Sequence, residues 1–150
     1  MKSLTHMAAN ILKTANVQTK IKLSKEYSDM WFDDRKNYNR ISIGNAACPD
    51  IPSKPNKPEL QPPRSMPKRK IGTESGKIAL IHSVAHIEFN AIDLHWDIIA
   101  RFGHMKFPIS FYDDWVSAAR DETKHFELLS RLLIDRESYY GALPAHDSMW

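Results

Sequence analysis

The sequence predicts an all-α protein: a long helical hairpin preceded by a small helical segment and a proline-rich strap. Apolar residues recur at alternating spacings of three and four in two stretches of the C-terminal half, which is typical of amphipathic helices. Before these stretches, seven prolines in residues 49–67 exclude a regular helix. We therefore expect three parts: an N-terminal helical segment over residues 1–43, a strap over 44–72 and the hairpin over 73–150.

The N-terminal part has helical spacing from Met7 to about Phe32. This pattern predicts a pair of short helices or one broken helix, with Ser24 as a candidate N-cap. We expect a small accessory module. Its apolar positions are Ile11, Leu12, Ala15, Ile21, Leu23, Tyr27, Met30 and Trp31.

The strap, from Gly44 to about Lys70, is predicted to follow an extended, polyproline-like path. Ile51, Leu60 and Met66 are spread among its prolines and indicate docking onto a folded surface. A flexible linker is the alternative interpretation.

The hairpin is predicted from two stripes of residues that face its core. Thr73 or Ser75 can cap the first helix, and Gly103 can end it. Pro108 and Ser110 mark the entry to the second helix. The first stripe is Ile78, Ile81, Ala85, Glu88, Ile92, His95, Ile99 and Phe102. The second stripe is Phe111, Trp115, Ala118, Glu122, His125, Leu129 and Leu132.

Polar residues at Glu88, Glu122 and His125 interrupt these stripes and are the candidate site. A buried, unpaired carboxylate costs roughly several kcal/mol, so such a residue needs a cation, a hydrogen-bond network or a metal beside it. Glu88 and Glu122 are symmetric about residue 105, which predicts that they face each other. His125 follows Glu122 by one helical turn. His95, a heptad from Glu88, is interpreted as a hydrogen-bonded core histidine.

A helix Glu followed by Glu-x-x-His resembles half of the site in ferritin-like di-metal carboxylate proteins. Residues 121–125, Asp-Glu-Thr-Lys-His, are similar to the Asp-Glu-x-Arg-His motif of diiron oxygenases, with Lys124 in place of Arg. Residues 78–93, the strap ending Pro-Lys-Arg-Lys and the loop at 140–147 resemble an uncharacterised bacterial ferritin-like family, the domain of unknown function 455. The resemblance covers essentially the whole chain. It implies a four-helix bundle and a di-metal site.

Ferritin-like sites take one Glu and one Glu-x-x-His from each of two helix pairs, whereas this chain has a single pair. Half of the ligands for two iron or manganese ions are therefore present. We expect that the chain is the N-terminal part of a longer bundle, with a further helix pair to follow. The alternative is a homodimer in which two copies complete the bundle.

Other candidate residues have weaker support. Asp121 can accept a hydrogen bond from a ligating histidine, or it can be an exposed acid. His82 and His86 lie close to the same face, but ordinary helix histidines are the expected outcome. Asp93 and Asp97 are expected to be solvated. The basic run of Arg64, Lys68, Arg69 and Lys70 can meet phosphate, or it can be solvated or paired with helix acids. His146 and Asp147 can form a functional pair, or they can belong to a turn with local hydrogen bonds.

Composition narrows the remaining functions. The net charge of +3 makes nucleic acid an unlikely partner, and the single cysteine, Cys48, excludes an intramolecular disulfide and any cysteine-rich zinc site. The sequence has no apolar run long enough to cross a bilayer and no secretory signal pattern. We expect a cytoplasmic protein; an organelle transit peptide is the weaker alternative.

The function that follows is an oxidoreductase with a diiron or dimanganese centre, using oxygen or peroxide to oxidise or hydroxylate a substrate that the sequence does not identify. Glu122 would bridge the two metals, and Glu88 and His125 would each bind one of them. A metal-free hydrogen-bond network is the alternative for these three residues. The corresponding alternative function is a non-catalytic binding or structural protein with a vestigial site.

Overall fold

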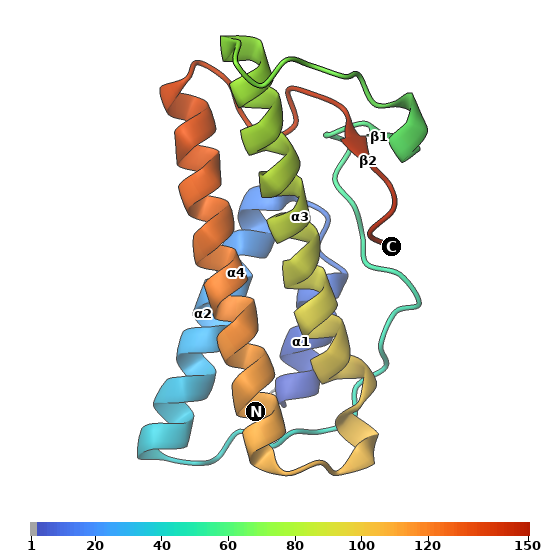
Figure 1. Ribbon diagram of the computed structural model, residues 1–150. Helices are drawn as coiled ribbons and strands as arrows, with labels where there is room; N and C mark the ends of the chain where they lie inside the picture. Colours follow the sequence, from blue (N-terminus) through green and yellow to red (C-terminus); the bar gives the residue numbers. More distant parts are fainter. Residues whose placement is uncertain (1–2) are drawn as a thin grey trace. The chain divides into compact units, whose positions relative to one another are not determined.

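The computed structural model describes residues 3–150 and is mostly helical (Figure 1). The four α-helices of this range are α1 (Leu4–Leu12), α2 (Val17–Asn37), α3 (Glu74–Arg101) and α4 (Ile109–Asp135). Two single-turn 3₁₀ helices, Pro63–Ser65 and Gly103–Met105, and two short strands, β1 (Leu60–Gln61) and β2 (Ala145–His146), complete the regular structure. The all-α class predicted from the sequence is confirmed.

The chain forms two compact units, and both long helices contribute to each unit. The first unit contains residues up to 54 together with 91–123, and the second contains 55–90 together with 124–150. The first therefore holds α1, α2, the C-terminal half of α3 and the N-terminal half of α4. The second holds the other halves of α3 and α4, the end of the strap and the C-terminal loop.

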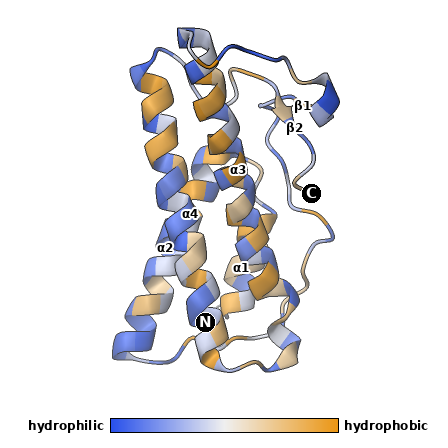
Figure 2. Cartoon of the chain, viewed as in Figure 1, coloured by the Kyte–Doolittle hydropathy of each residue, from blue (hydrophilic) through white to orange (hydrophobic). Residues whose placement is uncertain are grey.

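In the first unit, α1 and α2 confirm the prediction of two N-terminal helices. Ser3 and Asn16 are their N-caps, since each side chain accepts a hydrogen bond from a backbone N–H of the first turn. Ser24, the predicted cap, instead lies in the middle of α2 and is fully buried. Figure 2 shows mainly hydrophilic residues along α2 and more hydrophobic ones along α3.

The segment from Ser42 into the strap docks partly through its backbone. The Leu4 N–H donates to the Ser42 carbonyl at 2.9 Å, and the Ser53 N–H donates to the Leu12 carbonyl at 2.7 Å. The segment thus satisfies free backbone groups at both ends of α1. Ile51 is 68% exposed, so the prediction that it docks is wrong.

The connection between α3 and α4 depends on a close approach at Gly103. A Cβ at this position would lie 2.5 Å from Thr5 Cγ2, so only glycine leaves room for α1 to pack there. The left-handed backbone conformation of the turn falls instead on Lys106, with φ of 53°. At the other end of α3, Thr73 accepts a hydrogen bond from the Gly76 N–H at 3.0 Å, which confirms Thr73 as the cap.

The buried stripe of α4 is displaced by one residue from the predicted stripe. Half-exposed or exposed residues occupy the predicted positions; Leu132 is 45% exposed. The structure instead buries Tyr112, Val116, Ala119, Thr123, Phe126 and Leu133. Two neighbouring faces of α4 carry apolar residues, and spacing alone does not say which of them is covered.

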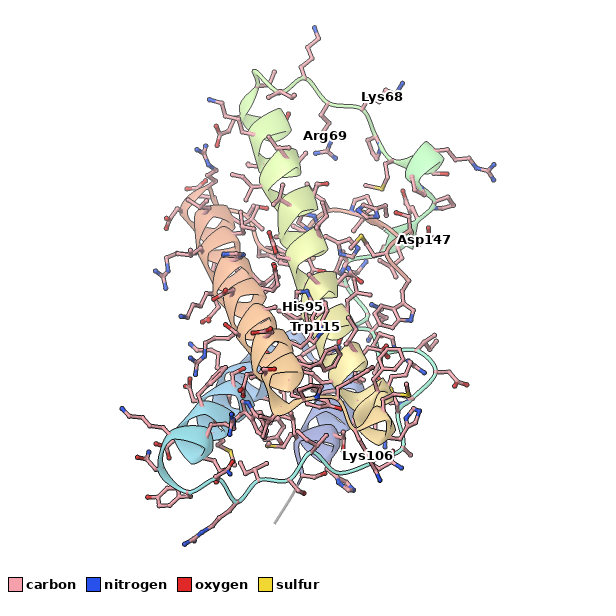
Figure 3. The ribbon with its side chains drawn as sticks, turned by 60° about the horizontal axis from the view of Figure 1, so that its bottom comes forward. Lys68, Arg69, His95, Lys106, Trp115 and Asp147 are labelled. Carbon is pink, nitrogen blue, oxygen red and sulfur yellow. The ribbon has the colours of Figure 1, made fainter. Side chains whose placement is uncertain are left out.

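Within each unit, α3 and α4 pack against each other through aromatic contacts. In the first unit, His95 and Trp115 have ring centroids 5.3 Å apart (Figure 3). In the second, Phe89 and Phe126 are also 5.3 Å apart, and Tyr140 contacts both rings. The C-terminal loop therefore contributes to the core of the second unit.

Candidate metal centre

The predicted ligands Glu88, Glu122 and His125 are close together in the structure. His125 Nδ1 lies 3.8 Å from Glu88 Oε2. Glu122 lies one turn before His125 on the same uninterrupted helix, so both side chains leave the same side of α4. One ligand atom from each of the three residues lies within 4.8 Å of the others. The proximity predicted from the symmetry of the hairpin is observed.

The exposure of this cluster differs from the prediction. The His125 side chain is 52% exposed and that of Glu88 is 21% exposed. The interpretation that these residues face a closed core is therefore wrong for this chain: they occupy a half-open face. Leu128 and Leu132, one and two turns after His125, are 57% and 45% exposed on the same side of the helix.

The donor set fits a hard divalent metal. Two carboxylates and one imidazole are the ligands that iron and manganese accept in oxygen-rich sites, and no thiolate is near to favour a softer ion. The separation of 3.8 Å between His125 Nδ1 and Glu88 Oε2 is longer than a hydrogen bond. Glu88 and His125 are thus close enough to share an ion without a direct hydrogen bond between these two atoms.

The histidines at positions 82 and 86 organise the C-terminal loop. His86 Nε2 donates to the His146 carbonyl at 2.9 Å, since a carbonyl can only accept. His86 Nδ1 then accepts from the Tyr140 hydroxyl at 2.8 Å. The Gly141 N–H donates to His82 Nε2 at 3.0 Å. Burial, with a smaller effect of the Arg69 charge, lowers the pKa of His82 from 6.5 to about 4, so this ring is neutral near pH 7.

His95 differs from its prediction as a hydrogen-bonded core histidine. Its Nδ1 is buried without a hydrogen-bond partner in the described part of the chain, and burial lowers the pKa of the ring. A tilted ring contact with Trp115, at an interplanar angle of 45°, is its main interaction. Asp121 is exposed, as one of its two interpretations expected.

The two aspartates of α3 that were expected to be solvated are paired. Asp93 is fully buried, and its Oδ1 accepts from Lys20 Nζ at 2.7 Å. Lys54 Nζ lies 3.6 Å from Asp93 Oδ2. Asp97 forms an ion pair with Arg101 at 2.6 Å. Sequence reasoning missed the Lys20–Asp93 pair, although Lys20 lies one helical turn before Ser24 and on the buried side of α2.

Comparison with known proteins decides the family. The chain matches, over residues 13–150, the family described as "Protein of unknown function (DUF455)". The protein belongs to this family. It is also 36% identical over 145 residues to an uncharacterised protein of Haemophilus influenzae. That alignment covers 93% of this chain and 50% of the relative, so the chain spans half the length of the relative it matches.

Two further findings concern solved structures and membrane-spanning helices. No solved structure matches the chain. Within the described residues, none of the helices is both long and apolar enough to cross a membrane.

Proposed function

We propose that Glu88, Glu122 and His125 hold part of a two-metal centre and that the protein is an oxidoreductase of the ferritin-like, carboxylate-bridged type. The observation that carries the proposal is the convergence of two carboxylates and one imidazole within 4.8 Å on two adjacent long helices. Bound iron or manganese would supply two-electron chemistry with dioxygen or peroxide as the oxidant. The substrate is left open.

The residues of this chain would supply half of the ligands. In a complete site, a second Glu and a second Glu-x-x-His face the first set across a four-helix bundle. Such a set would come from a further helix pair or from a second copy of the chain. The half-open face supports this requirement, because exposed Leu128 and Leu132 flank His125 where a partner helix would pack.

Metal binding tests the proposal directly. Purified chain is titrated with Mn²⁺, or with Fe²⁺ under anaerobic conditions, and its metal content and oligomeric state are measured together. We expect about two ions per completed four-helix site. His125→Ala and Glu122→Gln should each weaken binding by about 10- to 100-fold or more with unchanged helix content.

Two variants outside the cluster serve as controls for metal affinity. His104→Ala removes an exposed histidine outside the cluster and should leave metal affinity unchanged, and His95→Ala should affect it little. Absence of metal binding both in the wild-type chain and in a longer polypeptide that includes a further helix pair would reject the oxidoreductase. The chain would then be a binding or structural protein with a vestigial site.

Sedimentation tests how the site is completed. A homodimer that forms with metal and is lost in His125→Ala supports two copies around one centre. A stable monomer that binds metal only when a longer polypeptide includes a further helix pair supports completion within one chain. We propose a cytoplasmic location, because a single cysteine, Cys48, fits a reducing compartment.

A further inference from the structure

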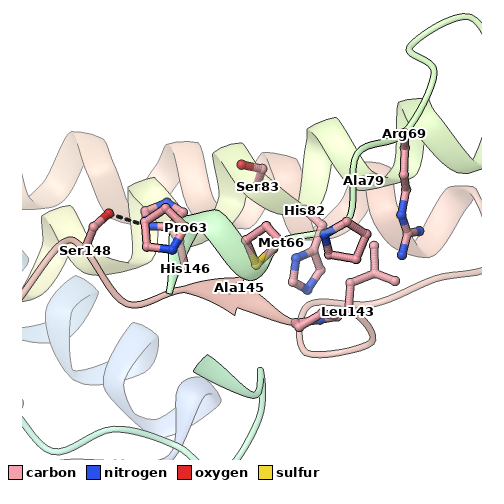
Figure 4. A pocket seen from close by; sticks show the side chains of 12 residues that line it. Pro63, Met66, Arg69, Ala79, His82, Ser83, Leu143, Ala145, His146 and Ser148 are labelled. Atoms are coloured by element: carbon pink, nitrogen blue, oxygen red, sulfur yellow. Dashed lines mark hydrogen bonds between the residues drawn. The ribbon is translucent and has the colours of Figure 1, made fainter. Parts of the chain in front are cut away.

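A cavity of about 380 Å³ lies in the second unit, and none of the three candidate metal ligands lines it. Its walls come from α3, from the strap after β1 and from the C-terminal loop around β2 (Figure 4). This volume lies in the lower part of the range of small-molecule pockets, about 300–1,000 Å³. The metal proposal does not use it.

Hydrogen bonds hold the walls in place. The Ala145 N–H donates to the Glu59 carbonyl at 2.9 Å, and the Asp147 N–H donates to the Gln61 carbonyl at 3.0 Å, so β2 is fixed to the strap. The same loop is fixed to α3 by the hydrogen bonds of His82 and His86. The cavity is therefore built without a ligand, which lowers the entropic cost of binding.

The lining combines an apolar body with one fixed positive charge. Met66, Pro67, Leu143 and Pro144 are among the apolar residues of the wall. Arg69 is the permanent cation of the lining, and no Asp or Glu occurs among the residues that line the cavity within the described chain. The structure records no ion pair for Arg69 in residues 3–150.

Neutral hydrogen-bonding groups lie beside this charge. His82 accepts the Gly141 N–H through Nε2, so its proton is on Nδ1. Ser83 is exposed on α3 and also lines the cavity. The lining thus offers a cation and polar groups next to an apolar surface, and this combination matches an amphipathic anion rather than a cation or a hydrocarbon.

We propose that this cavity binds a small organic acid, with its carboxylate paired to Arg69 and its apolar part packed against Met66, Leu143 and the adjacent prolines. The proposal is independent of the metal centre. If the cavity does not bind an organic acid, the metal proposal still stands. If the metal proposal fails, the cavity proposal still stands.

An NMR titration of the whole chain tests this with probes of equal length. Hexanoate should give saturable shifts of the His82, Ser83 and Leu143 amides, with a dissociation constant on the order of 1–10 mM for so small a molecule. Hexanol and hexylamine should bind at least about threefold more weakly, since they lack the anion. Equal binding of all three, or no saturation by roughly 100 mM hexanoate, would reject the proposal. Much tighter binding of hexyl phosphate would overturn the choice of a carboxylate.

Two variants and one control separate the effect of charge from the effect of cavity volume. Arg69→Gln changes an exposed side chain and should weaken hexanoate binding about three- to tenfold while hexanol binding is unchanged. Arg64→Gln removes an exposed cation of the same strap that does not line the cavity, and it should leave both affinities as they are. Ala79→Leu fills the cavity and should weaken both ligands. Unchanged hexanoate affinity in Arg69→Gln would contradict the proposal.

Discussion

Polar residues on two neighbouring faces of α3 and α4 have opposite surroundings. On one face, Asp93 is fully buried and meets Lys20 at 2.7 Å, and Ser24 joins Thr123 and the Trp96 indole at 2.8 Å each. On the other, the cluster of Glu88, Glu122 and His125 is partly exposed.

This contrast distinguishes polar groups that stabilise the fold from polar groups that are candidates for ligand binding. A buried polar group with a direct partner stabilises one packing of the helices, and removing the partner exposes the full desolvation cost. Two carboxylates that converge on a partly exposed face contribute little to stability, and such an arrangement is expected where a ligand binds. Four stability measurements test this contrast.

The largest effect is expected for Lys20→Met, which leaves Asp93 buried with the more distant Lys54. Breaking a buried pair costs about 3–5 kcal/mol in the free energy of unfolding, and the contact to Lys54 places this variant near the lower value. Urea denaturation measures this loss in the free energy of unfolding. Lys22→Met changes an exposed lysine of the same helix and should have little effect. A loss below about 1 kcal/mol would show that the pair does not hold the packing.

The next effect is the pH dependence from His82. Its folded pKa of about 4 lies below the ordinary 6.5, so the unfolded chain binds the proton more tightly. The stabilisation from neutral His82 is complete above pH 6.5 and is lost as the pH falls towards 4. We expect a loss of about 2 kcal/mol, allowing for solvent screening beside the exposed strap.

Comparison with His82→Gln isolates this contribution from other acidic groups. Glutamine can accept the Gly141 N–H through its side-chain oxygen but does not titrate in this range. The unfolding free energy of the variant should therefore fall less between pH 7 and pH 4. Parallel curves for the two proteins would contradict the assignment.

A smaller loss is expected for Ser24→Ala. Thr123 donates its own hydroxyl proton to the Ala119 carbonyl at 2.7 Å, so Ser24 donates to Thr123 and accepts from Trp96. Alanine leaves the buried indole N–H without this acceptor, at a cost of about 1.5 kcal/mol by thermal or urea unfolding. Ser83→Ala, at an exposed serine of α3, should change stability by less than about 0.5 kcal/mol.

The smallest effect is expected for Glu122→Gln without metal. Removing one of two converging carboxylates relieves repulsion, so the unfolding free energy should stay within about 0.5 kcal/mol of the wild type or rise. Thermal unfolding in a chelating buffer measures this. A destabilisation above about 1 kcal/mol would show that Glu122 stabilises the fold through its own contacts.

Periodicity and spacing predicted the helices and the meeting of Glu88 with Glu122, because both follow from local geometry. The helical repeat fixes which residues share a face, and equal distances from a turn place residues at the same level of a hairpin. The Thr73 cap followed in the same way from a local hydrogen bond.

The tertiary structure alone decided which faces are covered and which polar residues are paired. α4 has apolar residues on adjacent faces, and burial of Val116 and Phe126, rather than Trp115 and His125, depends on what packs against the helix. The Lys20–Asp93 pair joins residues 73 apart in the chain, and the cavity needs three segments fixed by hydrogen bonds between them. Such contacts depend on distances between segments that are remote in sequence. A local pattern of residues does not determine those distances.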